Sequence, residues 1–369
     1  MKRIIILIVL LFFAITLFGN SIILNKDKPS KGKWHFKPKK VWEVDSAGDT
    51  ILVKTAKIVV SNDGTIFVAE QKAQKLLVFN SEGKFLRAIG KQGEGPGEYK
   101  NLSTFYIIDD NVIVPAMSRF HYFKTNGKYM ETINPDISFL FPDAMIDKYK
   151  FLYTKSEKND KFETEMLKVF NLQDKTSTLI KKIISKKPNV VSSGKLTIMV
   201  KFDGTVVEYN NNFFYLGNKN KYLITKVDTK GKKIFEFGIK SRKKIKLTEK
   251  MKRARYDRVV LNGRKMPETL VDRLIKNDPD LVPYFNDITL VGNFIYVYVK
   301  DPRDNKVQKI DIFTNNGKYI YRSDFRLPEN LILKRGPVFK GKFAYVFAED
   351  EDGERKLIKY SINLPNKST

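Results

Sequence analysis

The chain has 369 residues, of which 42% are hydrophobic and 12% are aromatic, so it can bury a sizeable core. It contains no cysteine and only two histidines, His35 and His121, which excludes disulfides, thiolate metal ligands, a cysteine nucleophile and a zinc site with three imidazoles. The net charge of +27 could attract an anionic polymer or surface, but a general bias of the composition toward lysine is the preferred interpretation. Most basic residues are isolated lysines at turns, without clustered arginine and aromatic residues, so we do not expect a nucleic-acid partner.

The amino terminus has the pattern of an export signal. Lys2 and Arg3 precede an apolar run from Ile4 to Phe18, and small residues follow up to Ser21. Residues 1–21 are therefore a signal peptide, which gives a periplasmic or secreted protein, or an uncleaved apolar helix that anchors it in the membrane. Residues 22–40 are rich in lysine and proline, and we expect them to be a poorly ordered tether.

A hairpin motif recurs along the rest of the chain. In each copy two apolar strands are separated by a short polar turn. The turn ends in Gly, and a Lys follows it at the start of the second strand. The copies are Leu76–Ile89, Phe120–Ile133, Tyr222–Phe237 and Ile310–Tyr321, with weaker versions at Val169–Ile183 and Lys356–Asn363. Glycine at these turns adopts the positive φ that a tight hairpin requires without a steric clash. The pattern therefore predicts β-hairpins at regular intervals.

A second pair of apolar strands precedes most of these hairpins. The pairs are predicted at Ile58–Glu70, Phe105–Ala116, Ile198–Tyr209, Ile288–Val299 and Pro337–Ala348. Two hairpins make a four-stranded unit about every 45 residues, and a sheet that small must stack on its neighbours to cover its faces. We therefore predict an all-β fold, a six-bladed β-propeller of four-stranded antiparallel blades, over residues 41–365. The last unit lacks its outer strand, and we expect Phe36–Asp45 to complete it.

The first unit resembles a known repeat. Residues 63–89 (DGTIFVAEQKAQKLLVFNSEGKFLRAI) with residues 90–99 (GKQGEGPGEY) are similar to the NHL-type repeat of bacterial six-bladed β-propeller proteins. The similarity extends less closely to the second, fourth and fifth units, and least to the third and sixth. It implies the same fold, but no particular activity, because the family includes binding and scaffold modules as well as unrelated enzymes.

Residues 240–280 interrupt the repeat between the fourth and fifth blades. Thr248 is a good N-cap for a helix that we predict to run to about Val260. Pro267 opens a second helix that stops before Pro279 and has an apolar stripe of Leu270, Val271, Leu274 and Ile275. We expect this helical insertion to lie on the propeller as a lid, on the face that carries the loops between the two middle strands of each blade.

The candidate site residues follow from the strand assignment. On that loop face we expect Glu70, Arg119, Lys155, Asp301 and Arg303. The densest basic patch, next to the same face, consists of Lys240, Arg242, Lys243, Lys244 and Lys246. This patch fits either a solvated lid or a contact with an anionic polymer or membrane headgroups.

Three other motifs favour structural roles. The run Gly93–Gly97 has the composition of a phosphate cradle but precedes a strand instead of a helix, so we interpret it as a wide turn. The acidic cluster Glu349–Glu354 offers oxygen ligands for calcium without the spacing of a calcium loop, so a solvated hairpin tip is the preferred interpretation, and no other cofactor is predicted. His121 lies in a strand between Phe120 and Tyr122 and is expected to pack.

No acid–base pair or nucleophile can be assembled from the sequence. The leading hypothesis is therefore a non-catalytic binding or scaffold module outside the cytoplasm that holds a protein or glycan partner at its loops and channel mouth. Two alternatives remain open. One is a metal-assisted hydrolase or lyase with an oxygen-ligated ion in the channel, for which the inner strands offer Asp63, Asp109, Asp203 and Asp287. The other is a binder of anionic polysaccharide or lipid.

Overall fold

The structure is a computed structural model. It describes residues 22–116, 119–137, 142–159, 161–186, 189–193, 196–200, 204–254, 256, 260–261, 264–278, 280–304 and 306–365. The predicted signal or anchor at residues 1–21 lies outside the described residues. Within the described ranges, no helix has the length and apolar character needed to cross a bilayer.

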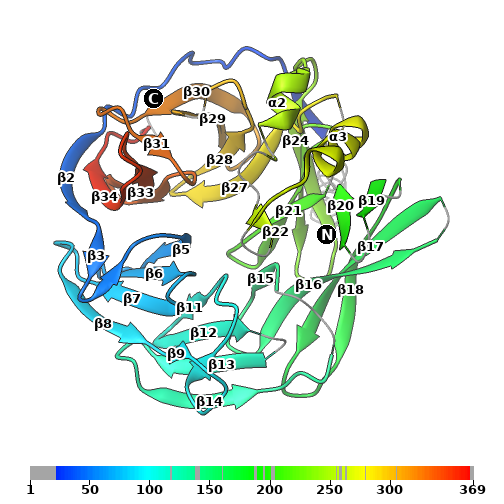
Figure 1. Ribbon diagram of the computed structural model, residues 1–369. Helices are drawn as coiled ribbons and strands as arrows, with labels where there is room; N and C mark the ends of the chain where they lie inside the picture. The colour runs from blue at the N-terminus through cyan, green and yellow to red at the C-terminus, as the bar shows by residue number, and fades with distance from the viewer. Residues whose placement is uncertain are drawn as a thin grey trace, which may run out of the picture. The chain divides into compact units, whose positions relative to one another are not determined.

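The chain folds as a six-bladed β-propeller of four-stranded antiparallel blades (Figure 1). It divides into two compact units, and residues 34–155, 166–181 and 324–369 form one of them. In that unit the first blade contains β5 (Thr55–Val60), β6 (Ile66–Glu70), β7 (Lys75–Phe79) and β8 (Phe85–Ile89). The second contains β11 (Tyr106–Ile108), β12 (Asn111–Ala116), β13 (Arg119–Lys124) and β14 (Tyr129–Ile133). Short pairs, β3 (Ser46–Ala47) with β4 (Thr50–Ile51) and β9 (Lys91–Gln92) with β10 (Glu98–Tyr99), lie in the loops.

The sixth blade combines strands from distant parts of the sequence. Its later strands are β31 (Ile332–Leu333), β32 (Val338–Lys340), β33 (Phe343–Glu349) and β34 (Arg355–Ser361). The outer strand is β2 (Lys39–Val44), which pairs antiparallel with β34. The prediction that Phe36–Asp45 completes the last blade is therefore confirmed.

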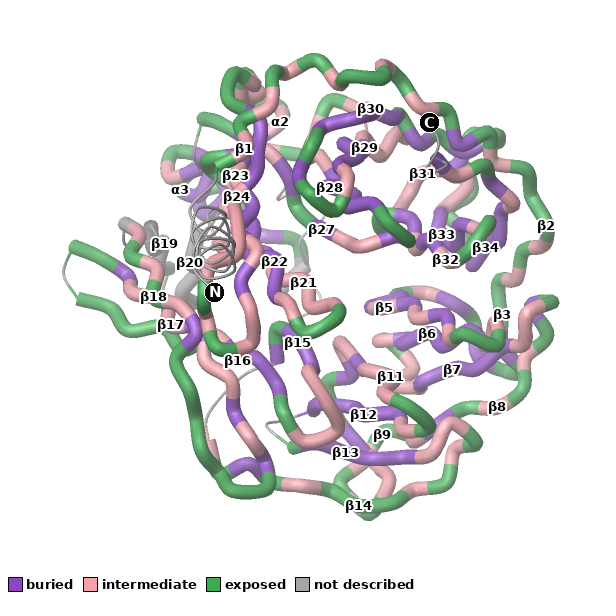
Figure 2. The backbone as a smooth tube through the Cα atoms, turned by 180° about the vertical axis from the view of Figure 1, so that it is seen from behind, coloured by how far each residue is buried: buried purple, intermediate pink, exposed green. Residues whose placement is uncertain are grey.

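The first blade is covered on both faces by its neighbours within this unit. Strand β6 is buried along its whole length, as expected for an inner strand that is apolar on both faces (Figure 2). Alternate side chains point to opposite faces of a strand. Accordingly, Phe67 packs in one cluster with Val112 of the second blade, and Ile66 packs in another with Phe347 of the sixth. Stacking of thin sheets thus builds the core.

The other unit comprises residues up to 33, 156–165 and 182–323. The fourth blade contains β21 (Thr205–Asn210), β22 (Phe213–Asn218), β23 (Leu223–Asp228) and β24 (Lys233–Ile239). The fifth contains β27 (Phe285–Val291), β28 (Phe294–Val299), β29 (Val307–Thr314) and β30 (Tyr319–Arg326). The third blade contains β15 (Ala144–Met145), β16 (Lys150–Lys158), β17 (Phe162–Asn171) and β18 (Ser177–Lys186), and its residues are divided between the units.

The predicted hairpin at Ile198–Tyr209 is wrong. Strand β20 (Leu196–Val200) pairs with β19 (Asn189–Ser193), whereas β21 pairs with β22. The turn between β21 and β22 explains the difference, because Asn211 and Asn212 both adopt positive φ, at 48° and 64°. Two consecutive asparagines in this conformation form the two-residue turn that favours a hairpin.

The insertion agrees with the prediction in its second half only. Thr248 caps α2 (Glu249–Arg253), because its side chain accepts a hydrogen bond from the Met251 amide. This helix does not reach Val260, which lies instead in β25 (Val260–Leu261), paired with β26 (Arg264–Lys265). A β-branched residue such as Val260 fits a strand better than a helix. Helix α3 (Glu268–Asn277) is confirmed, and its buried residues are the predicted stripe Leu270, Val271, Leu274 and Ile275.

Residues 22–40 are ordered against the blades, unlike the tether that we expected. Strand β1 (Ile22–Asn25) pairs parallel with β24 and adds a fifth strand to the fourth blade. The Asn25 side chain donates to Gly238 O at 3.0 Å and Gly317 O at 2.9 Å and accepts from the Tyr319 amide at 2.9 Å. One amide side chain thus connects β1 to two blades of this unit, which a composition-based prediction cannot detect.

Candidate functional site

Glu70, the first predicted ligand residue, has a structural role at the end of β6. Its side chain is 0% exposed. One carboxylate oxygen accepts from the amides of Val53 at 3.2 Å and Lys54 at 2.5 Å, and the other accepts from the Ala73 amide at 2.6 Å. The carboxylate therefore fixes two loops and has little capacity left for a ligand.

Asp301 and Arg303 lie together in the unit that holds the fourth and fifth blades. The Arg303 guanidinium donates to both Asp301 carboxylate oxygens, at 2.7 and 2.6 Å, and Lys309 Nζ lies 3.7 Å from the same carboxylate. The hydrogen bond from Arg303 lowers the pKa of Asp301. Asp301 and Arg303 therefore neutralise each other, and Lys309 adds one further positive charge beside them. Lys155 is an exposed residue of β16 in the other unit.

Arg119 borders a small cavity in the unit that holds the first and second blades. The cavity has a volume of about 220 Å³, and its lining residues come from the loop after β8 and from β12 and β13: Gly93, Glu94, Glu98, Tyr99, Lys100, Ala116, Arg119 and His121. Ala116 and Arg119 are paired at the end of the β12–β13 ladder, so these two lining residues are neighbours.

Tyr99 forms the buried part of the cavity lining. Its hydroxyl donates to Ile89 O at 2.6 Å and accepts from the Leu76 amide at 3.1 Å. Its ring lies so close to Gly90 that a Cβ atom there would be 2.2 Å from Cε1, so only glycine fits this position. Burial raises the pKa of Tyr99 well above its usual range. The residue is a neutral structural element whose hydroxyl is fully engaged.

His121 contributes a neutral imidazole to the lining. Its side chain is 6% exposed, and Nδ1 lies 3.0 Å from the Thr132 hydroxyl. Burial, and then the positive charge of Arg119, lower the pKa of His121 from 6.5 to about 4. No described residue forms a hydrogen bond with Nε2. The prediction that His121 packs in a strand describes its burial but missed its place at a cavity.

The acidic side chains of the lining already have partners. Glu94 pairs with Lys100, and Glu98 lies 3.2 Å from Lys91 Nζ. Glu98 also accepts from the amides of Glu94 at 3.1 Å and Gly95 at 3.0 Å. Its carboxylate therefore occupies the amides of the Gly93–Gly97 turn, which explains why this glycine-rich run is not open to a phosphate.

Arg119 is the charged lining residue whose charge is not neutralised. Its side chain is exposed, and it makes no hydrogen bond or ion pair with any residue that the structure describes. The cavity thus combines one available guanidinium, one neutral imidazole with an available Nε2, and an apolar part formed by Ala116 and Tyr99. Such a lining is typical of a small-ligand site, in which few polar groups orient the ligand.

The cavity lies within the part of the chain that matches a known family. Residues 47–266 match the family described as a domain of unknown function, DUF4934. The chain belongs to this family. The match includes all the cavity residues, from Gly93 to His121. A comparison with curated proteins finds no match.

Two solved structures are similar to this DUF4934 chain in fold. One is a protein from Bacteroides fragilis NCTC 9343 that is described as an exported protein. It shares 16% sequence identity with this chain, with a TM-score of 0.57, and the similarity covers 94% of this chain and 100% of that chain. The other is a DUF4221 family member from Bacteroides vulgatus ATCC 8482, with 12% identity, a TM-score of 0.54, and coverage of 90% and 98%. At these identities the similarity concerns the fold alone.

The residues of the predicted basic patch of this DUF4934 chain do not form one surface, because some of them are exposed and others are buried. Lys240, Lys243 and Lys246 are exposed. Lys244 donates to Asn220 Oδ1 at 3.1 Å and lies 5.2 Å from the centre of the Tyr284 ring, and burial lowers its pKa. Arg242 is not a surface residue, because its side chain is only 10% exposed. A contact with an anionic polymer stays a prediction for the three exposed lysines.

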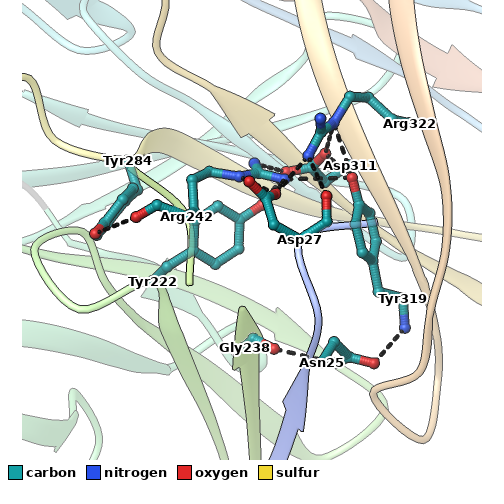
Figure 3. Close-up of polar contacts among 9 residues, drawn as sticks. All are labelled: Asn25, Asp27, Tyr222, Gly238, Arg242, Tyr284, Asp311, Tyr319 and Arg322. Carbon is teal, nitrogen blue, oxygen red and sulfur yellow. Dashed lines mark hydrogen bonds and ion pairs between the residues drawn. The ribbon is translucent and has the colours of Figure 1, made fainter. Parts of the chain in front are cut away.

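Arg242 belongs instead to a buried cluster of charged and hydroxyl groups in the same unit (Figure 3). Asp311, which is 0% exposed, pairs with Arg242 and with Arg322 Nε at 3.2 Å. It also accepts from the hydroxyls of Tyr222 and Tyr319. Burial, and then the Asp311 charge, raise the pKa of both tyrosines, so they remain neutral donors.

Asp27 connects this cluster to the segment after β1. Its carboxylate accepts from Arg242 Nε at 2.8 Å and Arg322 at 2.7 Å (Figure 3). With two carboxylates and two guanidiniums, the cluster is neutral overall and its donors are paired. We therefore assign it to holding residues 22–33 against the fourth and fifth blades rather than to ligand binding.

The acidic cluster Glu349–Glu354 is also paired within the protein. Glu349 lies 3.0 Å from Lys334 Nζ and 2.7 Å from Arg355 Nε, and Asp350 lies 3.3 Å from Lys356 Nζ. Among the residues that the structure describes, no group of three or more His, Cys, Asp or Glu side chains is placed to hold a metal ion. Asp203, one of the proposed channel ligands, lies outside them.

Proposed function

We propose that this DUF4934 chain is an exported binding module that holds a small ligand in the Arg119–His121 cavity. The observation that carries the proposal is the exposed Arg119 guanidinium, which has no partner among the described residues, beside a cavity with a neutral imidazole. The two other arginines at the predicted sites, Arg303 and Arg242, are already paired with carboxylates. A guanidinium left unpaired at a concave site is suited to recognition.

The protonation states of the cavity favour binding over catalysis. General acid–base catalysis works best with a group whose pKa lies near the working pH. His121, with a pKa of about 4, is a weak base, and neighbouring groups lower the pKa of Glu98, first the Gly95 amide and then Lys91. The Tyr99 hydroxyl is engaged by the backbone. Each group can contribute hydrogen bonds or charge, but none is tuned to transfer protons at neutral pH.

Export and the presence of NHL-type repeats remain parts of the proposal. Support for export comes from the pattern at residues 1–21 and from the name of the Bacteroides fragilis structure. The resemblance of residues 63–99 to an NHL-type repeat agrees with a propeller of the bacterial type. A ligand met outside the cytoplasm would come from the cell envelope or the surroundings, either free or as the end of a glycan or protein partner.

A cavity-filling substitution tests the binding function. Ala116→Val adds bulk to a buried lining residue, whereas Ala88→Val makes the same change at an exposed position of β8. The ligand panel contains neutral sugars, sugar acids, amino acids, short peptides and inorganic phosphate, and binding is measured by titration calorimetry. We expect Ala116→Val to lower the affinity for the panel's best ligand at least about tenfold, and we expect Ala88→Val to leave this affinity unchanged. Equal affinities in all three folded proteins would reject the cavity as the ligand site.

A further inference from the structure

We propose that the cavity ligand is a small hydroxy acid, with its carboxylate on Arg119 and a hydroxyl on Nε2 of His121. This inference rests on the proposed function and specifies its ligand class. The first argument is the charge of the lining. Lys100 and Lys91 neutralise Glu94 and Glu98, which leaves one positive charge at Arg119. A ligand with one negative charge balances it, whereas a dianionic phosphate would leave one negative charge in excess.

The second argument is the geometry of the available donors. A guanidinium has a planar fork of N–H groups that matches the two oxygens of a carboxylate. The Thr132 hydroxyl accepts a hydrogen bond from the Tyr129 hydroxyl, so its own hydrogen is available to His121 Nδ1. In that arrangement Nε2 carries the imidazole hydrogen and donates. A ligand hydroxyl oxygen is a suitable acceptor.

The third argument is size. At about 220 Å³, the cavity is smaller than the roughly 300–1,000 Å³ of sites for drug-sized ligands. It suits one sugar ring or one short acid. Ala116 and Tyr99 supply an apolar part for the carbon skeleton. A sugar acid combines this size with a single carboxylate and adjacent hydroxyls.

The test compares matched ligands on the full chain. The probes are D-glucuronate, D-lactate, D-glucose and inorganic phosphate, titrated by calorimetry at constant ionic strength. Glucuronate and glucose differ only in the group at C6, so their ratio isolates the carboxylate. We expect a hydroxy acid to bind at least roughly tenfold more tightly than glucose or phosphate, and we expect Arg119→Met to abolish this preference. Arg119→Lys should retain part of it, because a lysine keeps the charge but not the fork.

Arg303→Met is the matched control, since Arg303 is an exposed arginine already paired with Asp301. It should leave all the affinities unchanged. The inference is overturned if neither hydroxy acid binds, if glucose or phosphate binds as tightly, or if Arg119→Met has no effect. A neutral ligand whose binding is lost in Ala116→Val would overturn only this inference and leave the binding function standing.

Discussion

Replacement of Asp311 by alanine is expected to lower the free energy of unfolding by about 3–5 kcal/mol, because it removes the buried carboxylate and leaves the guanidiniums of Arg242 and Arg322 with a single carboxylate, that of Asp27, between them. Arg242, with a side chain only 10% exposed, would keep Asp27 as its remaining partner. The hydroxyls of Tyr222 and Tyr319 would also lose their acceptor. Urea unfolding followed by circular dichroism measures the loss.

The control for Asp311 is Asp272→Ala, in the same unit. Asp272 pairs with Arg253 across α2 and α3, with side chains 52% and 37% exposed. An ion pair this exposed contributes about 0–1 kcal/mol. If both substitutions lower the free energy of unfolding by the same small amount, Asp311 is not the central acceptor of a buried network. Asp311→Asn, which keeps an acceptor and removes the charge, should fall between the two.

Replacement of Phe36 by alanine is expected to lower the free energy of unfolding by about 3–5 kcal/mol, the usual range for truncation of a buried phenylalanine. Phe36 is 2% exposed, and its ring centre lies 5.0 Å from that of Phe339 and 5.7 Å from that of Phe325. Its carbonyl also accepts from the Asn363 amide at 3.0 Å. The segment before β2 thus packs against β30 and β32, and the same unfolding measurement tests this.

Phe162→Ala is the corresponding control at a phenylalanine that is 45% exposed. It should change the unfolding free energy by less than about 1 kcal/mol, because little apolar surface is lost from the core. A loss for Phe36→Ala as small as this would mean that residues 34–38 are the tether that their composition predicts.

The fold was predictable because its signals are local. A glycine turn between apolar strands marks each strong hairpin, and a strand such as Ile66–Glu70, apolar on both faces, indicates burial between sheets. The prediction failed where a pairing depended on a less distinctive turn. Asn211 and Asn212 adopt the positive φ that the turn between β21 and β22 requires. The preceding strand Leu196–Val200 is also apolar, so the sequence alone did not show which of the two strands pairs with β21.

The candidate site was predictable only in part, because its contacts join distant residues. Arg119 follows from the strand assignment, but its lack of a partner depends on which neighbours are already paired. Asp311 was missed, although an aspartate inside the apolar sequence of Ile310–Phe313 is itself a sign of a buried charge. Its partner Arg242 is 69 residues away and belonged to a run of basic residues that we interpreted as a surface.

Nuclear magnetic resonance of the two imidazoles tests the proposed site most directly. In the free protein, His121 should titrate with a pKa of about 4, because burial and the nearby Arg119 charge disfavour its protonated form. The substitution His35→Gln assigns the resonances. We predict that the panel's best ligand shifts the imidazole resonances of His121 and leaves those of His35 in place. Saturation of the protein without any change at His121 would contradict the account.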